Sequence, residues 1–232
     1  MSELFSKPLE QPPIRSFVRR QGRITQAQSD ALEQLWPLYG VEPEQYGKLP
    51  QMFPRPAPLI LEIGFGNGDS LAQMALAAPE KNFLGIEVHR PGVGHLLIKI
   101  EEFGLSNIRI CCTDAVEVME QHIANGSLSG LQLFFPDPWH KKRHNKRRLV
   151  NEKFVALTAK KLMQGGIIHM ATDWEDYARQ MLAVLQASNQ LENMAGDAGY
   201  SERPDYRPLT KFERRGQLRG HGVWDLLFKK EG

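Results

Sequence analysis

The spacing of apolar residues along the chain changes near residue 58. Before that point, a polar, proline-rich start precedes a helix predicted from Thr25 to Leu38, and residues 40–58 carry five prolines and predict a connector. After it, short apolar runs that suit buried strands alternate with segments of helical spacing. This alternation predicts an α/β protein with a parallel sheet.

The second part of the chain contains six predicted strands and four predicted helices. The strands are Leu59–Ile63, Asn82–Val88, Ile108–Cys112, Leu131–Phe135, Gly166–Ala171 and Val223–Phe228. The helices are Asp69–Ala78, Pro91–Gly104, Asn151–Leu162 and Trp174–Ala187. A length of 232 residues favours one domain with appendages. We expect an N-terminal basic arm and helix over residues 1–55 and a main domain over residues 56–232.

Charge and cysteine content narrow the class of protein. The net charge is only +2, from 29 basic and 27 acidic residues, but the basic residues gather at 15–23 and 141–148. The first cluster is either a solvated arm or an RNA contact. Two adjacent cysteines, Cys111 and Cys112, provide no disulfide framework, and no apolar run is long enough to cross a membrane. We expect a cytoplasmic protein that does not bind membranes.

A glycine-rich turn follows the first predicted strand. Gly64, Gly66 and Gly68 allow a tight turn and close approach by a ligand, but Asp69 stands where the dinucleotide fingerprint has its third glycine. A carboxylate at a helix N-terminus would repel a pyrophosphate. With Glu62 ending the preceding strand, the turn suits a ligand that carries positive charge and no phosphate, such as S-adenosylmethionine.

Acidic residues end four consecutive strands. The carboxyl ends of parallel strands lie at one edge of a sheet, so these side chains are expected to form one cofactor site. The four residues are Glu62, Glu87, Asp114 and Asp137. Two alternatives remain open, namely that Glu87 is a solvated strand end and that Asp114 is the N-cap of a helix, with Glu117 completing a capping box.

The stretch from Phe134 to Arg148 combines a carboxylate with a block of cations. Asp137 lies between two prolines, which bias it toward an extended conformation at a strand end. Six Lys or Arg and two His follow between His140 and Arg148, and they suit a polyanion such as a phosphate backbone. This combination predicts chemistry on nucleic acid.

Two other patterns have alternative explanations. His140 and His144 have the spacing of zinc ligands on a helix, but the cations between them would repel a metal ion, so we expect no metal site. Thr172 to Glu175 predicts a capping box, with Asp173 in the first turn of a helix. The charged run Arg203 to Arg219 predicts a loop that is solvated by default or functional.

Five segments together resemble the bacterial tRNA (guanine-N7-)-methyltransferase family. They are Leu61–Gly68, Gly85–His89, Pro136–His144, Thr172–Trp174 and Thr210–Arg214. The glycine turn alone is typical of class I methyltransferases, whereas the Pro-Asp-Pro-Trp run and the Thr-Lys-Phe-Glu run are specific to this family. The resemblance implies a Rossmann-like, mostly parallel seven-stranded sheet with helices on both faces and an antiparallel C-terminal strand.

The resemblance also implies which residues act. The residues expected to bind the cofactor S-adenosylmethionine are Glu62, Gly64, Gly66, Gly68, Glu87, Asp114 and Asp137. The residues expected to bind the substrate, a guanine of the tRNA variable loop, are Lys141, Asp173, Thr210, Lys211, Phe212 and Glu213. Those expected to bind other parts of the RNA are Arg143, His144, Asn145, Lys146, Arg147 and Arg148. No protein partner is required.

Asp137 is the expected catalytic residue. Guanine N7 carries a lone pair and needs no deprotonation, so a carboxylate that stabilises the positive charge on the methylated ring is a better hypothesis than a general base. Two other functions stay open. The Pro-Asp-Pro-Trp run also resembles the Asn-Pro-Pro-Tyr loop of amino methyltransferases, and a non-catalytic RNA-binding module would need no cofactor.

Overall fold

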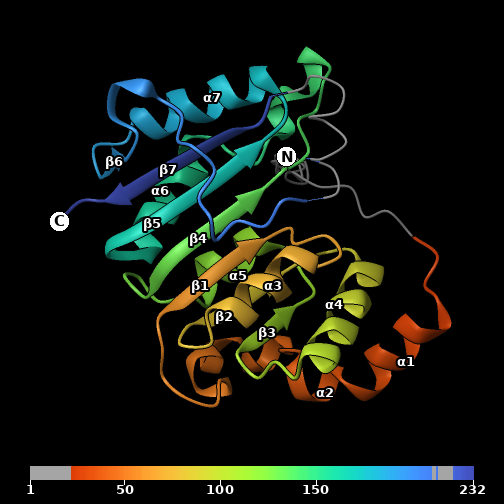
Figure 1. Cartoon of the computed structure of the whole chain (residues 1–232). Helices are drawn as coiled ribbons and strands as arrows, with labels where there is room; N and C mark the ends of the chain where they lie inside the picture. Colours follow the sequence, from red (N-terminus) through yellow and green to blue (C-terminus); the bar gives the residue numbers. More distant parts are fainter. Residues whose placement is uncertain (1–21, 211–212, 214–221) are drawn as a thin grey trace, which may run out of the picture.

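The computed structural model describes residues 22–210, 213 and 222–232. Within these residues, seven strands form one sheet in the order β3-β2-β1-β4-β5-β7-β6 (Figure 1). The strands are β1 (Leu59–Ile63), β2 (Asn82–Ile86), β3 (Ile108–Cys111), β4 (Leu128–Phe134), β5 (Leu162–Thr172), β6 (Leu191–Asn193) and β7 (Trp224–Lys230). The α-helices are α1 (Gln26–Gln34), α2 (Trp36–Tyr39), α3 (Asp69–Ala77), α4 (Arg90–Phe103), α5 (Ala115–Gln121), α6 (Glu152–Lys161) and α7 (Glu175–Gln186).

The direction of the strands agrees with the prediction. β1 pairs in parallel with β2 and with β4, and β3 and β5 continue the parallel arrangement outward on either side. β7 runs antiparallel to both of its neighbours, β5 and β6. The chain reverses its order between β1 and β4, so the carboxyl ends of these two strands flank the position where ligands bind in open α/β sheets.

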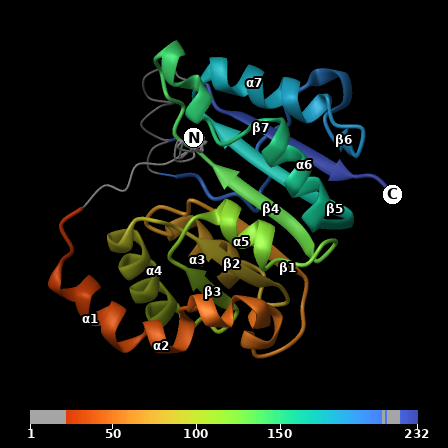
Figure 2. The same ribbon diagram turned by 180° about the vertical axis from the view of Figure 1, so that it is seen from behind.

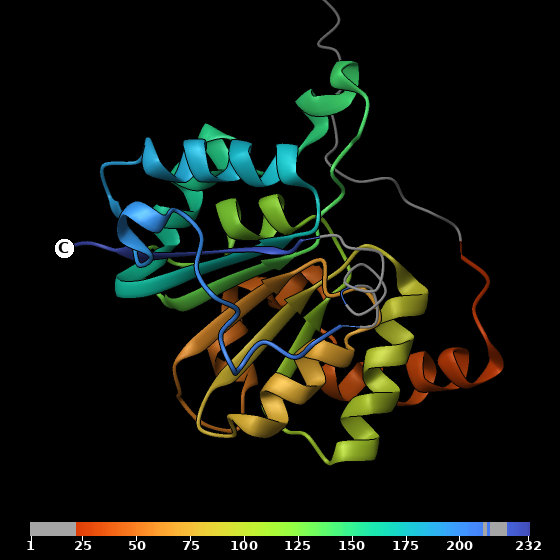
Figure 3. The ribbon, with the colours of Figure 1, turned by 45° about the horizontal axis from the view of Figure 1, so that its top comes forward.

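Helices cover both faces of the sheet (Figures 2 and 3). On one face, α1, α3 and α4 pack with Phe65, Phe83 and Ile110 in one apolar cluster. On the other face, α5, α6 and α7 pack over a second cluster that includes Leu61 and Met170. Burial of both faces explains why the central strands read as nearly continuous apolar runs.

The N-terminal region differs from its prediction. The helix expected from Thr25 to Leu38 is two helices, with Leu35 between them and Pro37 in the first turn of α2. The expected connector contains a 3-10 helix, η1 (Pro43–Met52), whose Tyr46 and Leu49 are buried in the core. α1 packs against α4 (Figure 1), and the domain boundary near residue 55 stays a prediction.

An α-helix and a strand were not predicted from the sequence, and two strands begin earlier than predicted. The helix α5 and the three-residue strand β6 had not been predicted, although Asp114 had been considered as a cap. β4 and β5 begin earlier than the sequence predicts. Gly130 and Gly166 interrupt the apolar pattern, which delays the predicted start, but the backbone stays paired there across a register shift. Among the described residues, no helix is long and apolar enough to cross a membrane.

A close backbone approach joins α4 to the turn after β1. A Cβ atom on Gly92, in the first turn of α4, would overlap the carbonyl oxygen of Gly66. Only glycine therefore allows α4 to start against this turn.

We predict that Gly92→Ala lowers the free energy of unfolding by about 1 to 3 kcal/mol, because the added methyl forces the turn and the helix apart. Chemical denaturation monitored by circular dichroism measures this change. Gly47→Ala is the matched control, since a Cβ there meets no atom within 4 Å, and it should stay within about 0.5 kcal/mol of the parent. Equal stability of Gly92→Ala and the parent would contradict the close approach.

Candidate functional site

The turn between β1 and α3 has a backbone that requires glycine. Gly64, Gly66 and Gly68 have φ angles of 71°, 60° and 77°, in the left-handed region. A Cβ on Gly64 or Gly66 would meet nothing within 4 Å, so the requirement there comes from the backbone conformation and not from crowding. The turn thus presents open backbone at the carboxyl end of β1.

Glu87 fastens this turn to the end of β2. One carboxylate oxygen accepts a hydrogen bond from the Gly66 amide at 2.9 Å, and the other accepts from Val88 at 2.6 Å and His89 at 2.9 Å. The residue is only 9% exposed, so the alternative of a solvated strand end is wrong. Glu87 therefore shapes the predicted cofactor site, and its expected contact with a ribose stays a prediction.

Glu62 is a buried acid with one unpaired carboxyl oxygen. It is 3% exposed, and its Oε2 atom has no hydrogen-bond partner. Burial, and secondarily the charge of Glu87, raise the pKa of Glu62 to about 8. A bound cation would favour the ionised form, so this position fits the ammonium and sulfonium charges of S-adenosylmethionine better than a phosphate.

Asp114 caps a helix, as one of the two interpretations had it. Its side chain accepts a hydrogen bond from the Val116 amide at 2.9 Å, and it is the N-cap of α5. The cap places the carboxylate at the carboxyl end of β3, one strand beyond β2. Its part in cofactor binding stays a prediction.

Asp137 lies in a turn that holds two residues in a rare conformation. Phe135 and Trp139, on either side of the Pro-Asp-Pro run, have φ angles of 51° and 49°. Non-glycine residues in this region are strained and persist where the surrounding structure holds them, often at functional sites. Asp137 itself is exposed, so the turn presents its carboxylate beyond the end of β4.

The basic segment after this turn projects from the sheet. It forms a 3-10 helix, η2 (Lys142–Arg147), drawn in green at the top of Figure 3. The Arg147 guanidinium lies over the Trp139 ring at 5.0 Å. The cations Lys141, Lys142, Arg143 and Lys146 are exposed. This part of the predicted RNA surface therefore faces solvent as expected.

Two polar members of the predicted RNA set are half-buried. Burial, and then the surrounding cations, lower the pKa of His144, which favours the neutral ring. Asn145 has a buried Oδ1 atom without a hydrogen-bond partner.

The sequence predicts Arg148 as an RNA contact, but its side chain is only 2% exposed. It donates hydrogen bonds inward, to Pro138, Asp176 and Gln180. We therefore leave it out of the proposed RNA surface.

Asp173 is exposed at the end of β5, close to the start of the Asp137 turn. The Phe135 amide donates to the Ala171 carbonyl at 2.7 Å, so the ends of β4 and β5 lie side by side. The predicted capping box from Thr172 to Glu175 is wrong. Trp174 is the N-cap of α7, and Thr172 instead accepts a hydrogen bond from the Trp174 amide at 3.2 Å.

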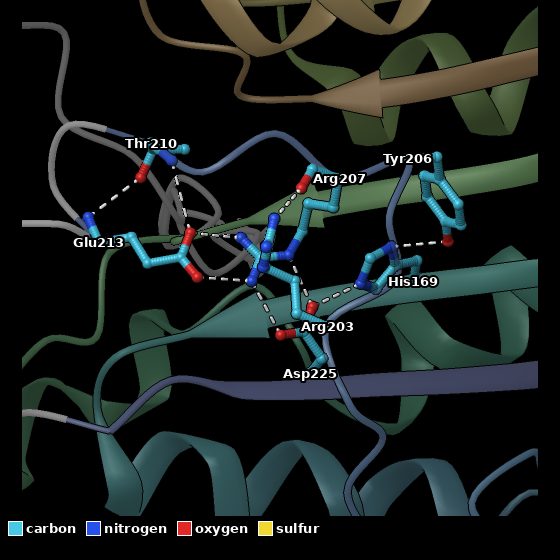
Figure 4. Close-up of polar contacts among 7 residues, drawn as sticks. All are labelled: His169, Arg203, Tyr206, Arg207, Thr210, Glu213 and Asp225. Carbon is cyan, nitrogen blue, oxygen red and sulfur yellow. Dashed lines mark hydrogen bonds and ion pairs between the residues drawn. The ribbon is translucent and has the colours of Figure 1, made fainter. Parts of the chain in front are cut away.

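Thr210 and Glu213 lie next to each other (Figure 4). The Thr210 hydroxyl accepts from the Glu213 amide at 3.1 Å, and Glu213 is 2% exposed. Both of its carboxylate oxygens accept from Arg207, at 2.7 and 2.8 Å. In the described structure this carboxylate therefore forms a two-point ion pair with Arg207. The predicted substrate residues Lys211 and Phe212 lie outside the described residues.

Arg207 joins this segment to the sheet, and the sequence analysis did not find it. The side chain is fully buried and donates to both oxygens of Asp225, at 2.7 and 2.9 Å (Figure 4). Its guanidinium also lies 5.9 Å from the Phe134 ring and 5.7 Å from the Phe135 ring. A carboxylate inside the apolar run of β7 was the signal that could have indicated a buried partner.

His169 completes the cluster from β5. Its Nε2 lies 2.7 Å from Asp225, and its Nδ1 lies 2.8 Å from the Tyr206 hydroxyl. Burial lowers the pKa of His169, which favours the neutral ring that donates to Asp225 and accepts from Tyr206. Burial alone would raise the pKa of Asp225, but hydrogen bonds from His169 and Arg207 outweigh it and the pKa is lowered.

Metal ligands do not gather in the described part of the chain. No group of three or more His, Cys, Asp or Glu side chains there is arranged to hold a metal ion.

Comparison with known proteins gives the family. Residues 56–226 match a family described as putative methyltransferase. The chain is 58% identical to the tRNA (guanine-N(7)-)-methyltransferase of Alcanivorax borkumensis, over 94% of this chain and 91% of that protein. It is also 58% identical to the enzyme of the same name from Aeromonas hydrophila subsp. hydrophila, over 94% and 92% of the two chains.

A solved structure supports the fold. The 16S rRNA methyltransferase KamB aligns with a TM-score of 0.55 at 13% identity, over 82% of this chain and 94% of that one. At this identity the likeness concerns the fold alone, which is that of a class I methyltransferase. The two sequence matches are far more identical and cover nearly the whole of this chain, and by them the chain belongs to the tRNA (guanine-N(7)-)-methyltransferase family.

Proposed function

We propose that the protein transfers the methyl group of S-adenosylmethionine to N7 of a guanine in the variable loop of tRNA. The observation that carries this proposal is the edge of the sheet where a glycine turn, buried acids and an exposed carboxylate adjoin a basic helix. The names of the relatives support the same reaction and the same substrate class. Methyl transfer to bulk tRNA, followed by mass spectrometry of the nucleosides, tests the proposal, and a methylated exocyclic amine would favour the amino-methyltransferase alternative.

The predicted cofactor residues are proposed to contact different parts of S-adenosylmethionine. S-adenosylmethionine supplies an electrophilic methyl group on a sulfonium. Glu62 offers an unpaired, buried oxygen for the positive charge, and Gly64 and Gly66 leave room for close approach. Glu87 and Asp114 lie at the next two strand ends and are proposed to contact the nucleoside part. Glu87 also holds the turn in shape, so its two roles are linked.

Asp137 is proposed to stabilise the transition state. The attacking N7 carries a lone pair, so the base need not lose a proton before the methyl is transferred. Positive charge moves onto the guanine ring during the step, and a fixed carboxylate beside the ring stabilises this charge. Lys141, Asp173 and Thr210 are proposed to orient the guanine, with Lys211 and Phe212. Glu213 was also predicted to contact the guanine, but it is buried and Arg207 binds both of its carboxylate oxygens, so we leave it out of the guanine site.

The basic helix is proposed to bind the tRNA backbone. The residues are Arg143, His144, Asn145, Lys146 and Arg147, of which the first and fourth are exposed cations. Phosphate contacts by such residues release counterions, so they make affinity depend on salt.

Asp137→Asn should keep the shape of the turn and remove its charge. We expect kcat to fall about 100-fold while the dissociation constant for tRNA changes little, because the carboxylate acts on charge that develops in the transition state. Single-turnover methyl transfer and filter binding measure the two quantities. A loss of tRNA affinity as large as the loss in kcat would show that Asp137 is a binding residue.

Glu62→Gln should remove a pH dependence of the protein's thermal stability. The pKa of Glu62 is raised in the folded protein from 4.5 to about 8, so its stability contribution is complete at low pH and is lost as the pH rises toward about 8. The melting temperature of the cofactor-free parent should therefore fall relative to that of Glu62→Gln across this range.

The same variant should change the proton balance of cofactor binding. At about pH 6.5 the parent should release up to about one proton on binding S-adenosylmethionine, and Glu62→Gln about none, as measured by calorimetry in two buffers. Equal proton release by both proteins would place the cationic groups of the cofactor away from Glu62.

Alanine at Arg143, Lys146 and Arg147 together should weaken tRNA binding and flatten its salt dependence. Each lost phosphate contact should reduce the slope of log affinity against log salt by about 0.7 to 0.9. Binding of S-adenosylmethionine is the internal control and should stay the same. Parallel salt plots for the variant and the parent would instead favour the basic arm of residues 15–23 as the RNA contact.

A further inference from the structure

Arg148 is a buried cation that contacts the residue next to Asp137. Its Nε atom donates to the Pro138 carbonyl at 2.8 Å. One terminal nitrogen donates to Gln180 at 2.6 Å, and the other to Asp176 at 2.7 Å. The guanidinium lies 4.8 Å from the centre of the Tyr177 ring. All three nitrogens are therefore committed to the Asp137 turn and to α7.

A second set of contacts joins the same two parts of the chain. The Val150 amide donates to the Tyr177 hydroxyl at 3.1 Å, and Gln180 donates to the Val150 carbonyl at 3.1 Å. Both anchors are on α7, so this helix holds the basic segment at its beginning, through Pro138, and at its end, through Val150. Arg148 provides the contact at the beginning.

The Asp137 turn needs such a contact. Phe135 and Trp139 hold positive φ angles, and strained residues relax unless neighbouring groups hold them. Two prolines supply no amide hydrogen for internal hydrogen bonds. Arg148 therefore supplies this turn with a hydrogen bond from outside it, to the Pro138 carbonyl.

Electrostatics also connect these groups. Burial raises the pKa of Tyr177 to about 12, the Arg148 guanidinium opposes this rise, and Asp137 adds to it. Arg148 and Asp137 thus both act on the Tyr177 hydroxyl. The partner carboxylate of Asp176 is 66% exposed, so the ion pair itself adds little stability.

We propose that Arg148 is a positioning residue for methyl transfer, which holds the Asp137 turn in its reactive geometry by joining the Pro138 carbonyl to α7. The inference rests on the proposed role of Asp137. It replaces an RNA contact, which the sequence pattern had suggested for this arginine.

Arg148→Lys tests the proposal, because a lysine cannot make three divergent hydrogen bonds from a planar group. We expect kcat to fall about 10- to 100-fold through displacement of the turn. The dissociation constants for S-adenosylmethionine and tRNA should change less than about 2-fold, and the salt slope of tRNA binding should equal that of the parent. Arg147→Ala should reduce this slope, so the two neighbouring arginines are separated by one experiment.

Two further variants keep the test independent of stability. Arg109→Lys is the control, because Arg109 is half-buried, also donates to backbone carbonyls, those of Ser106 and Ile108, and lies on the edge strand β3. Its kcat should stay within about 2-fold of the parent. If Arg148→Lys melts below the assay temperature, Asp176→Asn weakens the same contact from the exposed side and should lower kcat in the same direction.

A double-mutant cycle decides between positioning and mere stabilisation. If Arg148 acts through Asp137, Arg148→Lys should lower single-turnover rates in the parent and leave them unchanged in an Asp137→Asn background. Equal losses in both backgrounds overturn the positioning role while leaving the role of Asp137 in place. Full activity of Asp137→Asn alone would overturn the proposed role of Asp137 as well. A reduced salt slope in Arg148→Lys would return the arginine to the RNA surface.

Discussion

Parallel pairing of β1 with β2 on one side and with β4 on the other determines where the chemistry can occur. Ile63 lies beside Ile86 and beside Leu133, so the turns that follow these three strands leave the sheet at the same edge. The Gly64 amide continues the ladder to the Ile86 carbonyl at 2.8 Å, which brings Glu87 within reach of Gly66. A buried acid, a glycine turn and an exposed carboxylate come together because of this register.

Two buried arginines then hold the exposed carboxylate from opposite ends of its turn. Arg207 lies against Phe134 and Phe135, before Asp137, and anchors them to Asp225 on β7. Arg148 holds Pro138, after Asp137, and anchors it to α7. Both side chains have their donors satisfied, as buried charge requires. The strained turn therefore depends on partners that are distant in sequence.

The sequence predicted the parts of this arrangement that follow from local pattern. The first five strands were predicted within a few residues, and so were the acids at the ends of the first four. Apolar runs mark buried strands, and ligands bind at the carboxyl ends of parallel strands, so neither prediction needs knowledge of tertiary contacts. The partners of Arg207 were not predictable in this way. Asp225 is 18 residues away, and its approach depends on the antiparallel register of β5 and β7.

The basic run shows the same limit on a smaller scale. Six cations look alike in the sequence, yet only Arg148 turns inward, because η2 ends at Arg147 and the chain then returns to the core at Val150. The N-cap of α7 is Trp174, two residues after the predicted Thr172, because Thr172 is still part of β5. Composition predicted a cationic surface, and only the folded chain separates its members into solvent-facing and structural residues.

The geometry of the bound cofactor tests the proposed site most directly. A crystal structure of the complex with S-adenosylmethionine should place its ammonium group against Glu62, directly or through one water, and its methyl group on the side of the Asp137 turn. A cofactor whose amino acid part lies away from Glu62, with Oε2 still unpaired and the methyl group directed away from Asp137, would contradict it.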